Sequence, residues 1–183
     1  GVGSVAADSI IKERQLNGVY GSFISFIKRV DSKVVNKRVL EALALGGAFD
    51  SLTNVNRANF FHKINDLSFI EQVIQFRTQL IRNNQQKNQL TMFDSNIMSE
   101  MTQEPILDSS EQWDPLETLN KEKLVLGIYV SGHPLDDYSL EVNHFCTHQL
   151  KDIDLFIDPI THFSFAGYVQ SHVERIGKNQ KPY

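Results

Sequence analysis

One stretch decides the fold of the first half of the chain: residues 35–50, which read VNKRVLEALALGGAFD. Asn36 is of a residue type that caps helices, because its side-chain oxygen can accept a backbone N–H of the first turn. Apolar residues then recur at helical spacing, with Lys37 and Arg38 pointing away from their face. Gly46 and Gly47 end the pattern, as glycines commonly do after helices. The stretch therefore predicts a short amphipathic helix followed by a glycine turn.

Two helices are expected upstream of this stretch. The first opens after Gly1-Val2-Gly3 and ends near Asn17-Gly18. The second is capped by Ser22. Its apolar face comprises Phe23, Phe26, Ile27 and Val30.

Two more helices are expected downstream. One begins at about Asn56 and carries Phe60, Phe61 and Ile64. The other begins at Ser68-Phe69-Ile70-Glu71, which is the pattern of a capping box. It is expected to run to about Asn83 and then to fray into a Gln/Asn-rich tract.

The second half of the chain is more broken. Residues 94–112 have the composition of a linker, and Asp114-Pro115 then restarts a helix with proline at its first position. This helix is expected to end at Gly132-His133-Pro134, and a short one follows from about Asp136 to His144.

The periodicity changes at the C-terminal end. Phe163, Phe165 and Val169 alternate with polar or small residues, and residues 177–181 read GKNQK, which is typical of a hairpin turn. The expected fold class is therefore mostly α, with a truncated β hairpin at the C-terminus.

Composition narrows the class of protein. The chain has 183 residues, of which 41% are hydrophobic and 22% charged, as in globular proteins. The single cysteine, Cys146, excludes an intramolecular disulfide and a cysteine-cluster metal site, which favours a cytoplasmic origin. No apolar run is long enough to span a bilayer and the N-terminus lacks a signal-peptide pattern, so no membrane partner is expected.

Charge is distributed unevenly along the chain. Residues 1–87 carry a net charge of +5, whereas residues 88–183 carry −9. A basic half suits a polyanion as partner, and an acidic half would be repelled by it. The two halves are therefore expected to have different roles.

Gly1-Val2-Gly3 in front of a helix suits phosphate binding. Glycines allow close approach of the backbone, and the helix N-terminus presents free N–H groups and the positive end of the helix dipole. Six cations nearby could neutralise phosphates. They are Arg14, Lys28, Arg29, Lys33, Lys37 and Arg38. The alternative interpretation is an ordinary glycine turn beside a solvated basic face.

No catalytic motif is found. His133 with Asp136 and Asp137 could form an acid–base or metal group, but flanking Gly and Pro, with no second histidine at ligand spacing, favour a role in structuring a loop. The chain is therefore expected to hold no catalytic centre, no metal and no cofactor of its own.

The pentapeptide Gln89-Leu90-Thr91-Met92-Phe93 follows a polar run. It is too small to form a core, so its large apolar side chains are better explained by docking onto another protein. A turn at Met92-Phe93 would let Leu90, Met92 and Phe93 enter one apolar cleft.

Several stretches resemble the alpha subunit of bacterial DNA polymerase III. Gly1-Val2-Gly3 with Ile10-Ile11 is similar to the first helix-hairpin-helix element of that family, and residues 35–50 are similar to the second. Residues 122–135 closely resemble the segment that follows. Phe165-Ala166-Gly167-Tyr168-Val169, with the turn at 177–179, is similar to the first strands of the family's OB domain.

The resemblance implies a fragment of a replicative DNA-directed DNA polymerase that contacts duplex DNA and is tethered to the sliding clamp beside other holoenzyme subunits. It implies four parts: a helix-hairpin-helix region with supporting helices at 1–87, the clamp-binding motif and a linker at 88–112, a helical linker region at 113–158, and the truncated start of an OB domain at 159–183. The palm carboxylates, which work with Mg²⁺ in nucleotidyl transfer, would lie outside this chain.

The resemblance also implies site residues. For DNA they are Gly1, Val2, Gly3, Ser4, Lys37, Arg38, Gly46 and Gly47. For the clamp they are Gln89, Leu90, Thr91, Met92 and Phe93. The second hairpin reads Leu45-Gly46-Gly47 and departs from a regular phosphate-binding hairpin. Two alternatives remain: a stand-alone helix-hairpin-helix adaptor of DNA repair, and a small hydrolase that uses His133 and Asp136.

Overall fold

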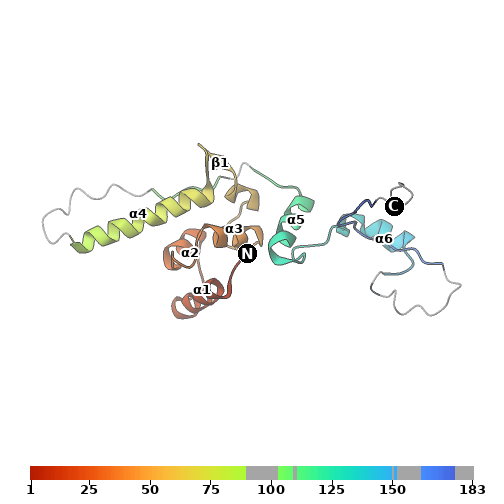
Figure 1. Cartoon of the computed structure of the whole chain (residues 1–183), viewed down its shortest axis with the longest axis horizontal. Helices are drawn as coiled ribbons and strands as arrows, with labels where there is room; N and C mark the ends of the chain where they lie inside the picture. The colour runs from red at the N-terminus through yellow and green to blue at the C-terminus, as the bar shows by residue number, and fades with distance from the viewer. Residues whose placement is uncertain (90–102, 109–110, 150, 152–161, 176–183) are drawn as a thin grey trace. The chain divides into compact units, whose positions relative to one another are not determined.

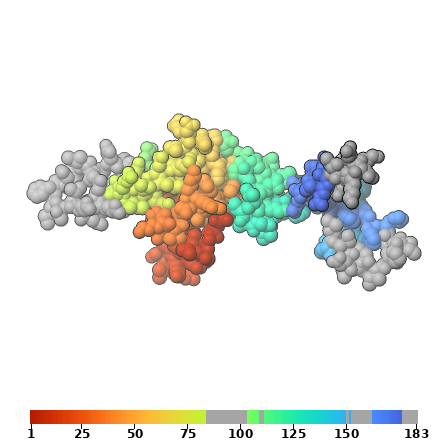
Figure 2. All heavy atoms as spheres, in the orientation of Figure 1, coloured from red at the N-terminus to blue at the C-terminus, as the bar shows by residue number. Residues whose placement is uncertain are grey.

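The computed structural model describes residues 1–89, 103–108, 111–149, 151 and 162–175 (Figure 1). These residues belong to two compact units, Gly1–Val130 and Ser131–Tyr183, each of which is described by itself. In the space-filling view, the side chains of residues 1–80 form one continuous surface (Figure 2). Within the described residues, no helix is long and apolar enough to cross a membrane.

The first three helices form as the sequence predicts. They are α1 (Ser4–Asn17), α2 (Phe23–Arg29) and α3 (Lys37–Leu45). Helix α1 ends at Gly18, whose φ of 78° lies in the left-handed region that glycine adopts without strain. The Ser22 hydroxyl accepts the N–H of Ser25 at 3.1 Å. Asn36 Oδ1 accepts the N–H of Val39 at 3.2 Å.

The prediction of a helix that begins at about Asn56 is wrong. The chain instead makes a 3₁₀ turn, η1 (Arg57–Phe60), and then a two-stranded antiparallel hairpin of β1 (Lys63–Ile64) and β2 (Leu67–Ser68). Ile64 pairs with Leu67, and the two residues between them have φ values of 52° and 65°. Asn and Asp are the non-glycine residues that tolerate this conformation, so Asn65-Asp66 favours a hairpin turn over a continuing helix.

The capping box at Ser68 is confirmed and opens α4 (Phe69–Gln89). The Glu71 carboxylate accepts the Ser68 N–H at 2.8 Å, and the Ser68 hydroxyl accepts the Glu71 N–H at 3.3 Å. Helix α4 continues to Gln89, beyond the expected end at Asn83.

Phenylalanine side chains fill the core of the first unit. Phe23 lies at the centre of this cluster, with ring centroids 4.8 Å from Phe49, 5.2 Å from Phe60 and 5.6 Å from Phe69. These rings come from α2, the turn after α3, η1 and the start of α4. Edge-to-face ring pairs add to the stabilisation from burial alone. The cluster therefore fixes α2 and α3 against α4.

Helix α5 (Pro115–Leu126) begins as predicted and ends earlier. Asp114 Oδ1 accepts the N–H of Glu117 at 2.7 Å, with proline at the first helical position. The expected end at Gly132 is wrong, because Gly127 adopts a left-handed φ of 81° and terminates the helix.

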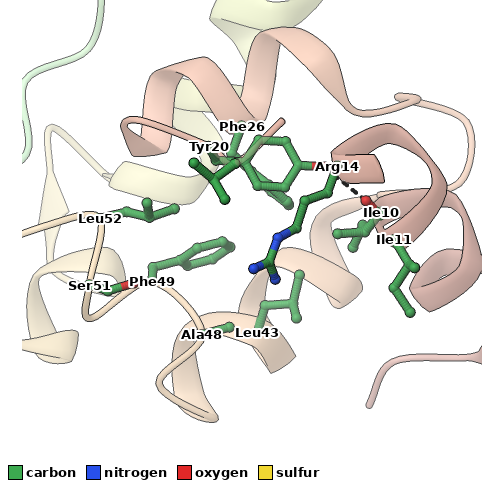
Figure 3. Close-up of a pocket in the computed structure, with 11 residues that line it drawn as sticks. Ile10, Ile11, Arg14, Tyr20, Phe26, Leu43, Ala48, Phe49, Ser51 and Leu52 are labelled. Carbon is green, nitrogen blue, oxygen red and sulfur yellow. Dashed lines mark hydrogen bonds between the residues drawn. The ribbon is translucent and has the colours of Figure 1, made fainter. Parts of the chain in front are cut away.

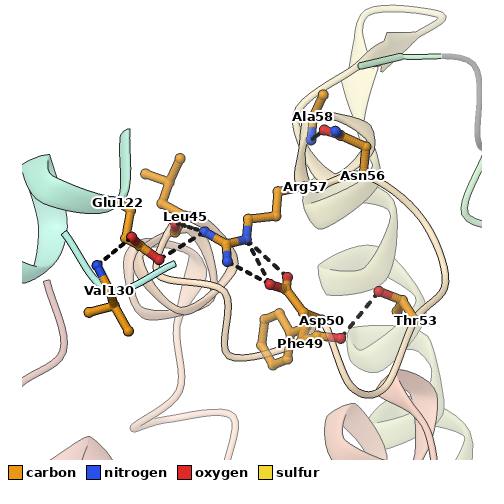
Figure 4. A network of polar contacts seen from close by, with 9 residues as sticks. All are labelled: Leu45, Phe49, Asp50, Thr53, Asn56, Arg57, Ala58, Glu122 and Val130. Carbon is orange, nitrogen blue, oxygen red and sulfur yellow. Dashed lines mark hydrogen bonds and ion pairs between the residues drawn. The ribbon is translucent and has the colours of Figure 1, made fainter. Parts of the chain in front are cut away.

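An ionic network that is buried around Glu122 joins α5 to the turn after α3 (Figure 4). Arg57 Nη1 lies 3.3 Å from Glu122 Oε1 and donates to the Leu45 carbonyl at 3.3 Å. Arg57 Nε donates to the Asp50 carboxylate at 3.0 Å. The second oxygen of Glu122, a side chain only 1% exposed, accepts the N–H of Val130 at 2.8 Å. One guanidinium therefore links three segments of the first unit.

The second unit contains η2 (Asp136–Tyr138) and α6 (Ser139–Phe145), close to the expected short helix. The C-terminal hairpin is not found where it was expected. Described residues 162–175 form no strand, and the N–H of Thr147 instead donates to the Ser164 carbonyl at 2.9 Å. The predicted turn at 177–181 lies outside the described residues. The fold is mostly α, and in the described part β1 and β2 form its small sheet.

Replacing Arg57 with leucine is expected to lower the free energy of unfolding by about 3 kcal/mol, because it removes the cation that balances the buried carboxylate of Glu122. Urea denaturation measures the change. The double variant Arg57→Leu/Glu122→Leu should recover much of the loss, because no unbalanced charge remains buried. Lys28→Leu, which breaks an exposed ion pair with Glu104, is the control and should shift stability by less than about 1 kcal/mol. Equal effects of Arg57→Leu and Lys28→Leu would contradict the prediction.

Candidate nucleic-acid interface

The N-terminus of α1 is open on one side. Gly3 caps the helix, and its carbonyl accepts the N–H groups of Ala6 and Ala7, both at 3.1 Å. The preceding donors, on Ser4 and Val5, are those that a helix leaves without an intrahelical partner. A Cβ added at Gly3 would meet nothing within 4 Å, and the Val5 side chain is 71% exposed. An anion could therefore approach the positive end of the helix dipole.

Gly1 has a different role because it touches α3. A Cβ at Gly1 would lie 2.9 Å from the Cβ of Ala42, which is too close. The start of α1 therefore lies close to α3. Arg38 lies one helical turn before Ala42, so it is on the same side of α3. Arg38 therefore lies on the side of α3 that carries Ala42, the residue that Gly1 approaches.

Lys37 and Arg38 differ in their partners. Lys37 Nζ lies 2.8 Å from Glu71 Oε1 and 3.8 Å from a carboxylate oxygen of Glu41. The hydrogen bond to Glu71 raises the pKa of Lys37. Arg38 is exposed and makes no hydrogen bond or ion pair with the part of the chain that the structure describes. Arg38 is therefore the better placed of the two to neutralise a phosphate.

The glycine pair after α3 is enclosed by the first unit's own side chains. A Cβ at Gly46 would lie 3.2 Å from the Ala42 carbonyl oxygen and 3.4 Å from Leu126 of α5. Gly47 has a φ of 77°, and a Cβ at this position would clash with Nη2 of Arg57. Glycine at position 47 is therefore required by the turn and by the Arg57 side chain packed against it.

Several of the other cations named from the sequence are engaged in the fold. Arg29 lies 2.8 Å from Glu13 and donates to the carbonyls of Gly18 and Val19, which ties α2 to the end of α1. Lys28 pairs with Glu104. Fewer charges are therefore available to a polyanion than the net charge of the basic half implies.

Arg14 lies over an apolar hollow of about 350 Å³ between α1, α2 and the turn at 48–52 (Figure 3). The Tyr20 hydroxyl borders the hollow and donates to the Ile10 carbonyl at 3.0 Å. Burial, together with the nearby Glu13 carboxylate, raises the pKa of Tyr20 to about 12. Most of the lining is hydrocarbon from residues such as Leu43 and Phe49, so the hollow is a poor site for phosphate.

His133 belongs to a local turn of the second unit. Its N–H donates to Asp136 Oδ2 at 2.6 Å, and its Nδ1 accepts the Leu135 N–H at 3.2 Å. These contacts give His133 the loop-structuring role favoured by the sequence. The described residues contain no cluster of three metal-ligating side chains.

The pairing of Glu122 with Arg57 was not predicted from the sequence. Leu119, Glu122 and Leu126 follow one another at helical spacing, so Glu122 lies on the apolar side of α5. A carboxylate in such a position requires a partner, and this is the signal that could have found the network. Of the predicted clamp-binding residues, Gln89 ends α4, and Leu90, Thr91, Met92 and Phe93 lie outside the described residues.

Comparison with known proteins first gives the class. Residues 1–60 match a family model described as a helix-hairpin-helix motif. This match covers α1 to η1, which include the open helix N-terminus and the glycine turn. Residues 1–60 of the first unit thus correspond to a helix-hairpin-helix motif.

More extended similarity then gives the family. The chain is 37% identical over 165 residues to DNA polymerase III subunit alpha of Borreliella burgdorferi, a match covering 89% of this chain. It is 34% identical over 186 residues, 99% of this chain, to the subunit of the same name from Neisseria meningitidis serogroup A. The chain spans 14% of the length of each of these relatives. It belongs to the DNA polymerase III alpha subunits as a segment of that family.

Acidification is expected to weaken the contact between α3 and α4. The Lys37 ammonium, together with the Ser68 N–H and hydroxyl, lowers the pKa of Glu71 from 4.5 to about 2. A lowered pKa in the folded state stabilises the fold above pH 4.5, and this stabilisation is lost as the pH falls from 4.5 to 2. The difference in melting temperature between wild type and Glu71→Gln should therefore shrink over this interval.

Thermal unfolding at several pH values measures this dependence, with Glu117→Gln on the exposed side of α5 as the control. The prediction is wrong if NMR of the Glu71 carboxyl carbon gives a pKa near 4.5.

Proposed function

We propose that the first unit contacts the backbone of duplex DNA through the N-terminus of α1 and Arg38. Two observations carry this proposal: Gly1, at the start of α1, approaches Ala42 of α3, and the exposed Arg38 precedes Ala42 by one helical turn. A helix N-terminus and an arginine together suit a phosphodiester, because each supplies N–H donors to its oxygens. The match of residues 1–60 to a helix-hairpin-helix motif supports the same function.

The predicted DNA-binding set is then divided by role. Gly1, Val2, Gly3 and Ser4 supply the backbone that approaches the phosphate, and Arg38 neutralises its charge. Lys37 adds charge from within its ion pair with Glu71. Gly46 and Gly47 act indirectly, by shaping the turn that holds α3 against Arg57.

In this proposal the whole protein is a cytoplasmic DNA-directed DNA polymerase of replication. The support is the name of the relatives, DNA polymerase III subunit alpha. Nucleotidyl transfer with Mg²⁺ belongs to parts of the protein outside this chain. The segment holds the enzyme on its product while the chemistry proceeds elsewhere, beside other subunits of a replicative assembly.

The tether to the sliding clamp is proposed to be Gln89, Leu90, Thr91, Met92 and Phe93. Its support is the sequence pattern and its position in the chain, which starts at the last residue of α4. The proposed division of the chain is therefore DNA contact in 1–87, clamp contact and linker in 88–112, a helical linker region in 113–158, and the start of an OB domain in 159–183.

Arg38→Gln is expected to weaken binding to a duplex of about 20 base pairs roughly 5-fold at low salt, because one phosphate contact is lost. The slope of log affinity against log salt should fall by about 1. Fluorescence anisotropy over a salt series measures both. Lys63→Gln on the hairpin is the matched control, since it removes one exposed charge away from α1. An equal effect of the two substitutions would mean that Arg38 contributes only general charge.

Simultaneous alanine replacement of Leu90, Met92 and Phe93 is expected to abolish binding to the bacterial sliding clamp, because the apolar anchors are lost. Calorimetric titration of the clamp with each chain measures this, and circular dichroism checks that the helices remain. Ile106→Ala truncates another exposed apolar side chain and should leave the affinity unchanged. Undiminished clamp affinity of the triple variant would remove the pentapeptide from the proposal.

A further inference from the structure

Arg77 is a buried cation without a hydrogen-bonded partner at one end of its guanidinium. It lies on α4 and is only 7% exposed, and its Nη1 has no hydrogen-bond partner among the described residues. Burial lowers the pKa of Arg77, and the nearby carboxylate of Asp31 partly opposes this effect. A buried N–H group without a partner costs free energy, so the position of this side chain requires a physical explanation.

The side chain borders a hollow of about 450 Å³ between α4 and the start of α3. Two more cations line it, Lys37 and Arg82. Polar groups complete the lining on the α3 side, where Ser32 contributes a hydroxyl and Asn36 an amide. Asn36 caps α3 through its Oδ1, which leaves its NH₂ group as a donor. Helix α3 has nine residues, and its N-terminus lies at this hollow.

The acidic groups nearby do not neutralise the hollow. Glu71 and Glu41 pair with Lys37. Asp31 acts on Arg77 through its charge alone, and its Oδ1 accepts the N–H of Lys33 at 2.8 Å. Arg82 is exposed and forms no hydrogen bond or ion pair with the described residues. The charged side chains that line the hollow itself are Lys37, Arg77 and Arg82, all of them cations.

We propose that this hollow binds a phosphate group, and that its occupant is a phosphodiester of the DNA backbone. Guanidinium groups match phosphate oxygens through paired N–H donors, and amide and hydroxyl donors beside a helix N-terminus are further phosphate ligands. The inference rests on the proposed contact of the first unit with DNA. It adds a second contact on the α4 side of α3, separate from the contact at α1 and Arg38.

The test compares Arg77→Gln with wild type, using the whole 183-residue chain. Duplex DNA of about 20 base pairs is titrated by fluorescence anisotropy over a salt series. Arg77→Gln should weaken binding about 5-fold and lower the salt slope by about 0.9, the value for one phosphate. Arg77→Lys should retain the slope but not the full affinity, because it keeps the charge without the paired donors. Lys63→Gln is the matched control for loss of one positive charge.

A second measurement uses inorganic phosphate alone. Phosphate should raise the melting temperature of wild type more than chloride of equal ionic strength does, and this difference should be absent in Arg77→Gln. Arg82→Gln, at an exposed position, should reduce the same difference, and it serves as the test variant if circular dichroism shows Arg77→Gln unfolded.

The two measurements separate the possible failures. The proposal is supported if Arg77→Gln loses the rise in melting temperature that phosphate causes and also shows a smaller slope of log affinity against log salt. A lost phosphate effect with an unchanged salt slope, or without any DNA binding by wild type, overturns the assignment to the DNA backbone and leaves a site for free phosphate. No phosphate effect in wild type, with an unchanged slope in the variant, overturns the site itself while the contact at Arg38 stands.

Discussion

The buried pair of Arg57 and Glu122 is the constraint on which the arrangement of the first unit depends. The two side chains come from segments 65 residues apart, and the carboxylate is almost fully enclosed. A carboxylate in such a place is tolerated only with a cation and hydrogen-bond donors around it. Arg57 therefore has to reach across the turn after α3, and Gly47 leaves the space through which it passes. The glycine turn, η1 and α5 are in this way parts of one structure.

This constraint changes the interpretation of the glycine turn after α3, which the sequence suggested as the second helix-hairpin-helix element. A glycine pair beside a helix suggests a backbone that a phosphate can approach. The glycines in front of α1 allow such an approach, because the space beside Gly3 is open. In the turn after α3, Gly46 leaves room for Leu126 and Gly47 leaves room for Arg57. Glycine serves close approach in both places, toward solvent in one and toward the protein's own side chains in the other.

The fold also selects which charges of the basic half can meet DNA. Lys28, Arg29, Lys37 and Arg57 all pair with carboxylates. Arg38 lies exposed on the side of α3 that carries Ala42, whereas Arg77 and Arg82 lie on the α4 side of α3. Helix α3 therefore separates two groups of cations, and each has a helix N-terminus near it. A basic segment of net charge +5 is thereby resolved into two small candidate contacts rather than one diffuse surface.

The sequence by itself determined the local structure, because the interactions that set it span four residues or fewer. The caps at Ser22, Asn36 and Asp114 and the capping box at Ser68 lie where their patterns predict them. The β1–β2 hairpin, which replaces the helix expected from Asn56, also has a local cause, because Asn65 and Asp66 tolerate a positive φ. Tertiary structure alone decided which charged groups remain free. Lys37 meets Glu71 from 34 residues away and Arg57 meets Glu122 from 65. Such pairs depend on which side chains packing brings together, and no local periodicity encodes that.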